Sequence, residues 1–380
     1  RSEAIPERDV EDALDDAVNQ AFVVERRAPR STIKQLDKEV KWEEIPEDEK
    51  YLYLEAEKKQ WDEHLRYEAV RVHPPEDAGL LRAKVPANRI LKARFAYRDK
   101  NVAKRREDPT IPAKAKARLC IGGHMDPDLQ KGEINTEAPT ASKTSMFTLL
   151  FLAAQFGWRL AAGDVEAAFL NGIESKRNLY FEPPKRGLPG VEPGSLVEIV
   201  KGVFGLSNSP RLWWDKLAGE LKNLDIIVNG IQLRLAHHDF DPCLFLLQER
   251  DDPNKLRGAL ITHVDDLLIA APPGEIQQLM KGLSAIFPIA EWEQGNFEYT
   301  GSTITQYDDV IEVHQKSYIN FRLETVEFPA AYNLDDPADE VTKQDNMSTV
   351  GALSWLASQS RPDLQAGVSL AQRKQKSPTY

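Results

Sequence analysis

Residues 256–270 read LRGALITHVDDLLIA, so that Asp265 and Asp266 stand between two strongly apolar runs. Short apolar runs on both sides of a polar step are typical of two paired β-strands. We therefore expect a hairpin with strands at 256–264 and 267–270. An Asp-Asp pair also suits an ordinary surface turn. Because adjacent carboxylates between buried strands repel each other and are costly to desolvate, a site for a cation is the alternative interpretation.

Another aspartate, Asp164, precedes this hairpin by about a hundred residues. It ends a stretch whose alternate residues are expected on one face of a strand. The residues that share this face are Trp158, Leu160, Ala162 and Asp164. Phe169 follows Asp164 by five residues, and from this pattern alone it is equally well explained as a core aromatic.

Periodic apolar residues predict helices around these strands. The expected helices span 51–67, 142–156, 211–224 and 275–287. The first is expected to carry a narrow stripe of Leu54, Lys58, Trp61 and Leu65. Ser142 and Thr144 are the candidate N-caps of the second.

Basic and apolar residues alternate at 90–97 and 117–121, which predicts a hairpin with a long polar tip at 99–112. Residues 1–45 lack periodicity and are expected to form a tail or linker of low order. Helices mixed with hairpins predict an α+β fold.

Composition limits the class of protein. The chain has 380 residues, of which 41% are hydrophobic, and no run reaches the roughly 18 apolar residues of a membrane span. Its first residues lack the order of a signal peptide, so we expect neither secretion nor a membrane partner. A start at Arg1 suggests a fragment or a processed product. Cys120 and Cys243 lie far apart, which is incompatible with a disulfide framework or a cysteine zinc site.

Charge is unevenly distributed along the chain. The net charge is −11, yet residues 89–118 hold 11 Lys and Arg against 3 Asp and Glu. Residues 1–69 hold 20 acidic against 12 basic residues. Because fields are local at physiological ionic strength, the basic segment can bind phosphates in an acidic chain. A solvated basic loop is the simpler alternative.

The order of motifs resembles the reverse transcriptase of copia-type (LTR) retrotransposon Pol polyproteins. DVEAAFLNG at 164–172 precedes the Val-Asp-Asp hairpin, and between them VFGLSNSPRLW at 203–213 resembles the family's "YGLKQAPRxW" block. Four further blocks keep the family's order within a resemblance that runs from about Lys58 to Tyr380. They are KARL at 116–119, EAPT at 137–140, FEYTG at 297–301, and GALSW at 351–355 with RPDL at 361–364.

This resemblance implies a right-hand polymerase with fingers, palm and thumb around an antiparallel palm sheet. The implied activity is that of an RNA-directed DNA polymerase, a nucleotidyltransferase that adds dNTPs to a primer on an RNA or DNA template. The implied segments are an acidic tail or linker at 1–57, fingers and palm at 58–300, a thumb-like segment at 301–340, and at 341–380 the start of a connection towards an RNase H domain. The implied location is the cytoplasm, in a virus-like particle, or the nucleus. No oligomeric state is predicted.

The resemblance also assigns the residues of the site. The implied catalytic carboxylates are Asp164, Asp265 and Asp266, which with the carbonyl of Val165 hold two Mg²⁺ ions, replaceable by Mn²⁺. Strand alternation is expected to point Asp266 to the opposite side, so that its role is less direct.

Further residues are implied in substrate binding. Arg118 would lie over the triphosphate, with Arg98 or Lys100 as a second basic contact, and Phe169 would be the steric gate against a ribose 2′-hydroxyl. Phe204 and Gly205 would line the nucleotide pocket, and Gly301 would belong to the primer grip. Trp213 and Trp214 are expected to pack in the core.

The chain also departs from the family's pattern. His263 stands where the family has Tyr, and its imidazole can titrate near neutral pH. Gly122 stands where Lys or Arg is usual, and Ser207-Asn208 replaces Lys-Gln. These losses leave open a catalytically decayed copy that acts only as a nucleic-acid-binding protein. The intact aspartates argue against decay, and a third alternative, an acidic scaffold protein, leaves the basic hairpin unexplained.

Overall fold

The computed structural model describes residues 39–323, 325–326, 328 and 333–380. Most of the tail expected at 1–45 therefore lies outside the described residues. The chain divides into two compact units, of which the larger extends from Asp37 to Arg322 and the smaller contains Leu323–Tyr380. In the described part of the chain, no helix has the length and apolar character needed to cross a membrane.

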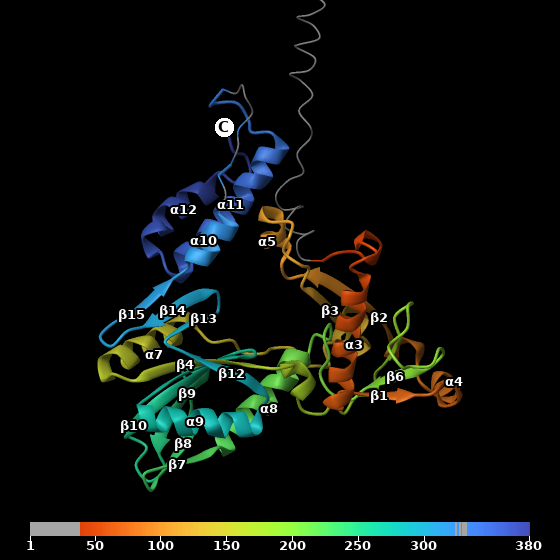
Figure 1. Ribbon diagram of the computed structural model, residues 1–380, viewed down its shortest axis with the longest axis horizontal. Helices are drawn as coiled ribbons and strands as arrows, with labels where there is room; N and C mark the ends of the chain where they lie inside the picture. Colours follow the sequence, from red (N-terminus) through yellow and green to blue (C-terminus); the bar gives the residue numbers. More distant parts are fainter. Residues whose placement is uncertain (1–38, 324, 327, 329–332) are drawn as a thin grey trace, which may run out of the picture. The chain divides into compact units, whose positions relative to one another are not determined.

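A sheet of seven antiparallel strands forms one side of the larger unit (Figure 1). In spatial order its strands are β12 (Ile289–Gln294), β4 (Arg159–Val165), β11 (Asp266–Ala271), β10 (Leu256–His263), β9 (Asp241–Glu249), β8 (Ile231–His238) and β7 (Asp225–Val228). The expected hairpin is thus confirmed as β10–β11, and β4 lies directly beside β11.

Helices cover both faces of this sheet. The first face carries α8 (Ser209–Asn223) and α9 (Pro273–Ile286), whose apolar side chains join one core cluster with Leu267 and Ile269 of β11. The opposite face carries α7 (Lys143–Phe156), in a cluster with Leu268 and Ala270. The same cluster takes in a small sheet of β13 (Asn296–Tyr299), β14 (Ser302–Gln306) and β15 (Ile311–His314). Burial on both faces explains why the middle of β10 (258–261) and most of β11 (267–271) are apolar.

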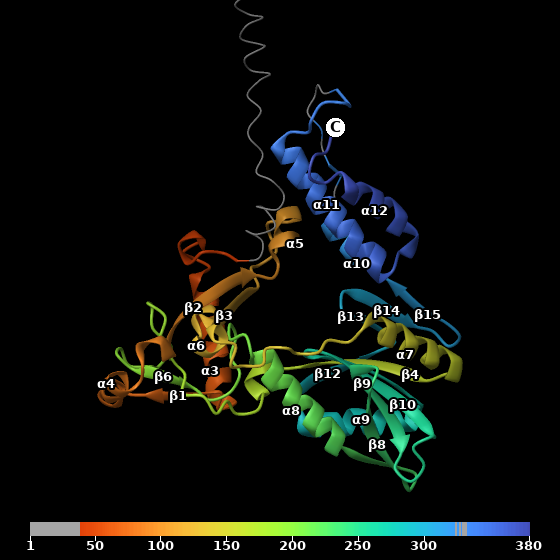
Figure 2. The same ribbon diagram turned by 180° about the vertical axis from the view of Figure 1, so that it is seen from behind.

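A second sheet of five strands completes the larger unit (Figure 2). Its order is β1 (Val70–His73), β6 (Leu196–Ile199), β5 (Tyr180–Glu182), β2 (Ile90–Asp99) and β3 (Ala115–Ile121). The expected basic hairpin is β2–β3, and its tip contains a short helix, α5 (Val102–Glu107). The remaining elements of this unit are η1 (Trp42–Glu44), α3 (Lys50–Arg66), α4 (Pro75–Lys84), η2 (Ala87–Arg89), η3 (Gly123–Met125), α6 (Pro127–Gln130), η4 (Ala168–Asn171) and α10 (Lys316–Arg322).

Of the stripe expected on α3, Trp61 is buried as expected, whereas Leu54, Lys58 and Leu65 are exposed. Leu54 and Leu65 are 46% and 43% exposed. The buried residues are Tyr53, Glu57, Gln60, Trp61 and His64. Glu57 can be buried because its carboxylate accepts a hydrogen bond from the Tyr97 hydroxyl of β2. A polar residue with a buried partner thus takes a position that hydrophobicity alone assigns to the surface.

The three segment boundaries that the resemblance implies fall at the following places in the structure. The boundary at residue 57 falls inside α3, and Val40 already forms a β-bridge with Tyr97, so this part of the acidic segment belongs to the folded unit. The boundary at 300 falls in the turn between β13 and β14. The boundary at 340 coincides with the first residue of α11.

The smaller unit contains α11 (Glu340–Gln359), η5 (Pro362–Leu364) and α12 (Gln365–Arg373). Its core includes Val350 and Ala357 of α11 with Val368 of α12. Asp339 caps α11, since its carboxylate accepts a 2.8 Å hydrogen bond from the Thr342 amide.

Candidate active site

A two-residue turn, Val264-Asp265, joins β10 to β11, because His263 pairs with Asp266 across the hairpin. Val264 has a φ of 61°, in the left-handed region that a β-branched residue rarely adopts. Both carbonyls of the turn accept hydrogen bonds. The Trp213 indole N–H donates to the Val264 carbonyl at 2.6 Å, and the Val165 amide donates to that of Asp265 at 3.0 Å. The second bond ties the tip of the turn to the residue that follows Asp164.

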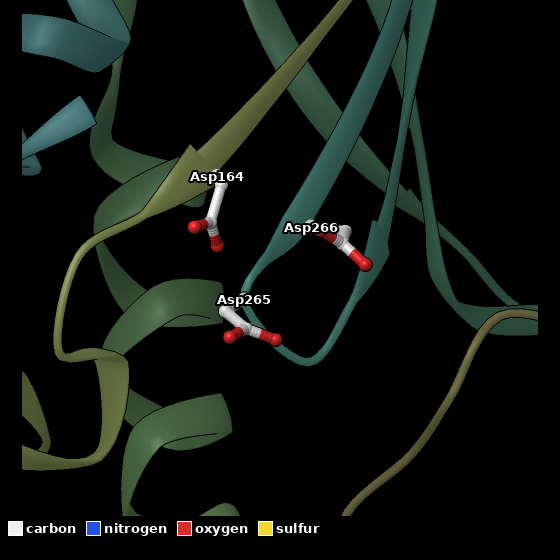
Figure 3. Close-up of side chains that lie close together, drawn as sticks. All are labelled: Asp164, Asp265 and Asp266. Atoms are coloured by element: carbon white, nitrogen blue, oxygen red, sulfur yellow. The ribbon is translucent and has the colours of Figure 1, made fainter. Parts of the chain in front are cut away.

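Three carboxylates meet at this turn (Figure 3). Asp164, at the end of β4, pairs in register with Asp266 of β11. One oxygen from each of Asp164, Asp265 and Asp266 lies within 4.8 Å of the others. The sequence predicts that Asp266 points to the opposite side from Asp265. Figure 3 shows its carboxylate turned away from the other two, although one of its oxygens stays within 4.8 Å of theirs. Asp266 shares a face of the sheet with its cross-strand partner Asp164.

The carboxylates perturb one another. Burial, and then the charges of Asp265 and Asp164, raise the pKa of Asp266 to about 6. Partial loss of hydration, followed by repulsion from Asp265 and Glu166, raises the pKa of Asp164. Within the described residues, none of the three aspartates forms an ion pair with a basic side chain. Clustered oxygen donors with uncompensated negative charge fit a hard divalent cation such as Mg²⁺.

Four basic residues of the β2–β3 hairpin gather opposite these carboxylates. Arg98 and Lys116 are cross-strand partners, and Arg118 lies two residues along the same face as Lys116. Burial, together with repulsion from Arg118, Lys100 and Arg98, lowers the pKa of Lys116. The positive charges of Lys116 and Lys100 act on Asp164 in the direction opposite to its neighbouring carboxylates. Like charges placed together without anionic partners in the described chain favour a bound anion.

Other basic residues of segment 89–118 stabilise the fold instead. Arg89 pairs with Asp128 at 2.6 Å, and Arg94 pairs with Glu39. Arg105 forms a 2.8 Å ion pair with Asp99. Three arginines of the basic segment are thus neutralised within the protein, whereas Arg98, Lys100, Lys116 and Arg118 form no ion pair within the described residues.

Two aromatic rings adjoin Arg118. Its guanidinium lies 4.9 Å from the centre of the Phe204 ring, which in turn meets the Phe169 ring edge-on at 5.5 Å. Phe169 is half-buried and packs against the core cluster around the seven-stranded sheet, which agrees in part with its core interpretation. The Ile121 amide of β3 donates to the Phe204 carbonyl at 2.8 Å. Gly205, with a φ of 99°, packs so closely on Ile121 that a Cβ would lie 2.1 Å from its carbonyl oxygen.

Gly301 lies in the turn between β13 and β14, which begins beside the carboxylates. Its neighbour Tyr299 lines a cavity of about 180 Å³ together with Asp164 and Asp266. Burial, and then the charge of Asp266, raise the pKa of Tyr299. The same cavity is lined by Glu291, Glu293 and Glu298, which the sequence did not single out. This cavity is therefore strongly acidic.

The pKa of the His263 imidazole departs from the expectation that this ring titrates near neutral pH. Burial lowers its pKa, and the charge of Asp265 opposes that change. The direction of the shift favours the neutral ring at neutral pH. Trp213 lies in the core as expected, with 1% of its surface exposed. The sequence did not predict its hydrogen bond to the turn.

The sequence profile of the family described as "Reverse transcriptase (RNA-dependent DNA polymerase)" matches residues 89–340, well over half of the chain. The chain belongs to this reverse transcriptase family. Its hairpin aspartates and Asp164 lie within the matched segment, as do the basic strand β3 and Phe169.

Curated relatives confirm the resemblance to copia-type retrotransposon Pol polyproteins. The retrovirus-related Pol polyprotein from transposon RE1 of Arabidopsis thaliana is 26% identical over 206 residues, which cover 54% of this chain and 13% of that protein. The corresponding polyprotein from transposon TNT 1-94 of Nicotiana tabacum is 29% identical over 180 residues, covering 46% of this chain and 12% of that protein. The match thus spans a small part of each relative.

Solved structures with similarity to the chain include the foamy viral protease-reverse transcriptase. In complex with RNA/DNA hybrid, that protein is 11% identical, with a TM-score of 0.38 over 70% of this chain and 30% of its own. In complex with dsDNA the TM-score is 0.36, with 12% identity over 70% of this chain and 46% of its own.

The raised pKa of Asp266 predicts how stability depends on pH in the metal-free protein. The pKa is about 6 in the folded state and about 3.9 in an unfolded chain. Ionisation of Asp266 therefore costs stability above pH 6, and this cost disappears as the pH falls towards 4. In EDTA at about pH 7.5, Asp266→Asn should raise the free energy of unfolding by on the order of 1–2 kcal/mol.

Denaturant unfolding at about pH 7.5 and about pH 4.5 measures this effect, and the gain should shrink at the lower pH. An Asn variant that is equally destabilised at both pH values would show that Asp266 carries no ionisation cost in the fold.

Proposed function

We propose that this chain is an RNA-directed DNA polymerase that adds deoxynucleotides to the 3′-hydroxyl of a primer paired with an RNA or DNA template. The observation that carries the proposal is the juxtaposition of opposite charges. Asp164, Asp265 and Asp266 converge at one turn, and the basic face around Lys116 lies close enough to act on the pKa of Asp164. A nucleoside triphosphate with divalent cations matches both surfaces at once.

The carboxylates are the proposed site of two Mg²⁺ ions, for which Mn²⁺ can substitute. Asp164 and Asp265 would hold them, assisted by Asp266 and the Val165 carbonyl. When bound, such ions neutralise charge on the attacking oxygen and on the triphosphate. The chain itself would contribute position: β4 and the turn hold the carboxylates in place, and no side chain need act as a nucleophile.

The basic face and the aromatic pair would form the nucleotide pocket. We assign Arg98, Lys100 and Arg118 to the triphosphate. Phe169 would lie against the sugar. Phe204 and Gly205 would form the adjoining wall, since their loop is bonded to the strand that carries Arg118.

The larger unit would then provide most of a right-hand polymerase. We propose the seven-stranded sheet with α7, α8 and α9 as the palm, and the five-stranded sheet with the β2–β3 hairpin as the fingers. The turn at Gly301 would belong to the primer grip. The segment at 301–340 would be thumb-like, and 341–380 would begin a connection towards an RNase H domain.

The proposed partners follow from this chemistry. A primed template of RNA or DNA and dNTPs would bind across the larger unit, since the substrates of this reaction carry phosphates that match its basic face. The proposed location is the cytoplasm, in a virus-like particle, or the nucleus, as for an element that copies its own RNA.

Primer extension on poly(rA)/oligo(dT) with Mg²⁺ tests the proposed function. Asp164→Asn or Asp265→Asn should lower the rate at least about a hundredfold, because each removes charge from a shared cation site. Asp239→Asn, which changes an exposed aspartate in the β8–β9 turn, is the matched control and should extend normally.

If either site variant retained more than about a tenth of the wild-type rate, the catalytic assignment would be wrong. A wild-type protein that binds the duplex but never extends it would instead support the decayed, nucleic-acid-binding alternative.

The contact with the triphosphate is testable at Arg118. Arg118→Ala should raise the KM for dTTP by about tenfold or more, because a charge-assisted contact is lost, while the affinity for duplex changes less. Arg94→Ala is the matched control, since Arg94 lies on the same strand pair but is neutralised by Glu39. Steady-state kinetics of both variants give the comparison. Equal KM values in the two would place Arg118 outside the nucleotide site.

Sugar selection tests Phe169. Phe169→Val should admit UTP and reduce the preference for dTTP over UTP by roughly 10–200-fold, because a smaller side chain leaves room for a 2′-hydroxyl. Single-nucleotide incorporation measures this preference, with Phe240→Val as an exposed control. If selectivity stayed constant while the melting temperature and both rates fell together, Phe169 would be a core residue only.

A further inference from the structure

The turn that carries Asp265 has a conformation that its own sequence does not favour. Two-residue hairpin turns with positive φ prefer Gly and Asn. The chain follows this preference at the β7–β8 turn, Asn229-Gly230, where both residues have positive φ. At β10–β11 the positive φ instead falls on Val264, a β-branched residue. Something outside the turn must therefore hold this conformation.

Trp213 supplies the outside contact. It lies in α8, is 1% exposed, and its ring packs edge-on against Phe287 of the same core cluster at 5.5 Å. From this fixed position its indole N–H donates the 2.6 Å hydrogen bond to the Val264 carbonyl. The adjacent Trp214 differs, since its indole takes no part in the hydrogen bonds that hold the turn.

We propose that Trp213 is a positioning residue for Asp265. Its hydrogen bond fixes the peptide between Val264 and Asp265, so that the Asp265 carbonyl meets the Val165 amide and its carboxylate stays beside Asp164. Without the indole donor, a carbonyl at the edge of the core loses its partner, which favours rotation of this peptide. Asp265 turns with it and the carboxylate cluster opens. The inference rests on the proposed function, because the carboxylate that Trp213 positions is one that the proposed reaction uses.

The competing explanation is that Trp213 only fills the core. Trp213→Phe separates the two, because it keeps an aromatic ring and removes the donor. We expect kcat to fall by about tenfold or more, since small displacements of a catalytic group are costly. The KM for dTTP should change little. Mn²⁺ binding, measured by electron paramagnetic resonance without substrate, should weaken by several-fold. Trp214→Phe is the matched control and should leave kcat and Mn²⁺ affinity unchanged.

A second substitution that restores function distinguishes a positioning residue from one that only fills the core. Val264→Gly added to Trp213→Phe should restore part of both kcat and Mn²⁺ affinity, because glycine adopts the positive φ without help from the indole. A residue that only fills the core would not be rescued in this way. If Trp213→Phe does not fold, replacing Trp213 with 3-benzothienylalanine keeps the shape of the indole and removes the N–H.

Wild-type kcat and Mn²⁺ affinity in the donor-free variant would overturn the inference, as would a loss of both that Val264→Gly fails to restore. These outcomes differ from failure of the proposed function, in which the wild-type chain itself extends no primer. In that case the Mn²⁺ affinities of the same variants still decide whether Trp213 positions Asp265.

Discussion

The carboxylates of Asp164, Asp265 and Asp266 repel one another, and the surrounding fold holds them close together. Asp164, Asp265 and Asp266 present oxygens within 4.8 Å of one another, and their charges are not neutralised by basic side chains in direct contact within the described residues. Such a cluster opposes folding in the absence of a cation. It persists because β4 and β11 are buried on both faces, and because backbone hydrogen bonds hold the turn to Val165 and Trp213.

The surrounding fold distributes charge in a complementary way. Three arginines of the basic segment are neutralised by acidic partners and stabilise the five-stranded sheet. The group around Lys116 remains free of such partners in the described chain and lies where it influences Asp164. The acidic total charge of the protein therefore does not conflict with a phosphate-bearing substrate, because the two signs are separated within one unit.

The sequence predicts an element correctly where its local pattern of apolar and polar residues matches the burial of those residues in the fold. The β10–β11 hairpin could be predicted because apolar runs flank Asp265 and Asp266. The start of α7 at Lys143 could be predicted because Ser142 is a capping residue. The prediction fails where a tertiary contact overrides the pattern. Glu57 is buried on α3 because the Tyr97 hydroxyl donates a hydrogen bond to its carboxylate. The β7–β8 hairpin was missed although Asn229-Gly230 is a strong turn signal, whereas no local signal pairs Trp213 with Val264.

The central claim is that the turn at Val264-Asp265 completes a cation site used for nucleotidyl transfer. The most direct test is a crystal structure of the chain with a primer–template, dTTP and Mn²⁺, analysed by anomalous scattering at the manganese edge. If this site holds the cations, anomalous peaks should place manganese ions in contact with carboxylate oxygens of both Asp164 and Asp265. Bound dTTP with no manganese at these two carboxylates would contradict it.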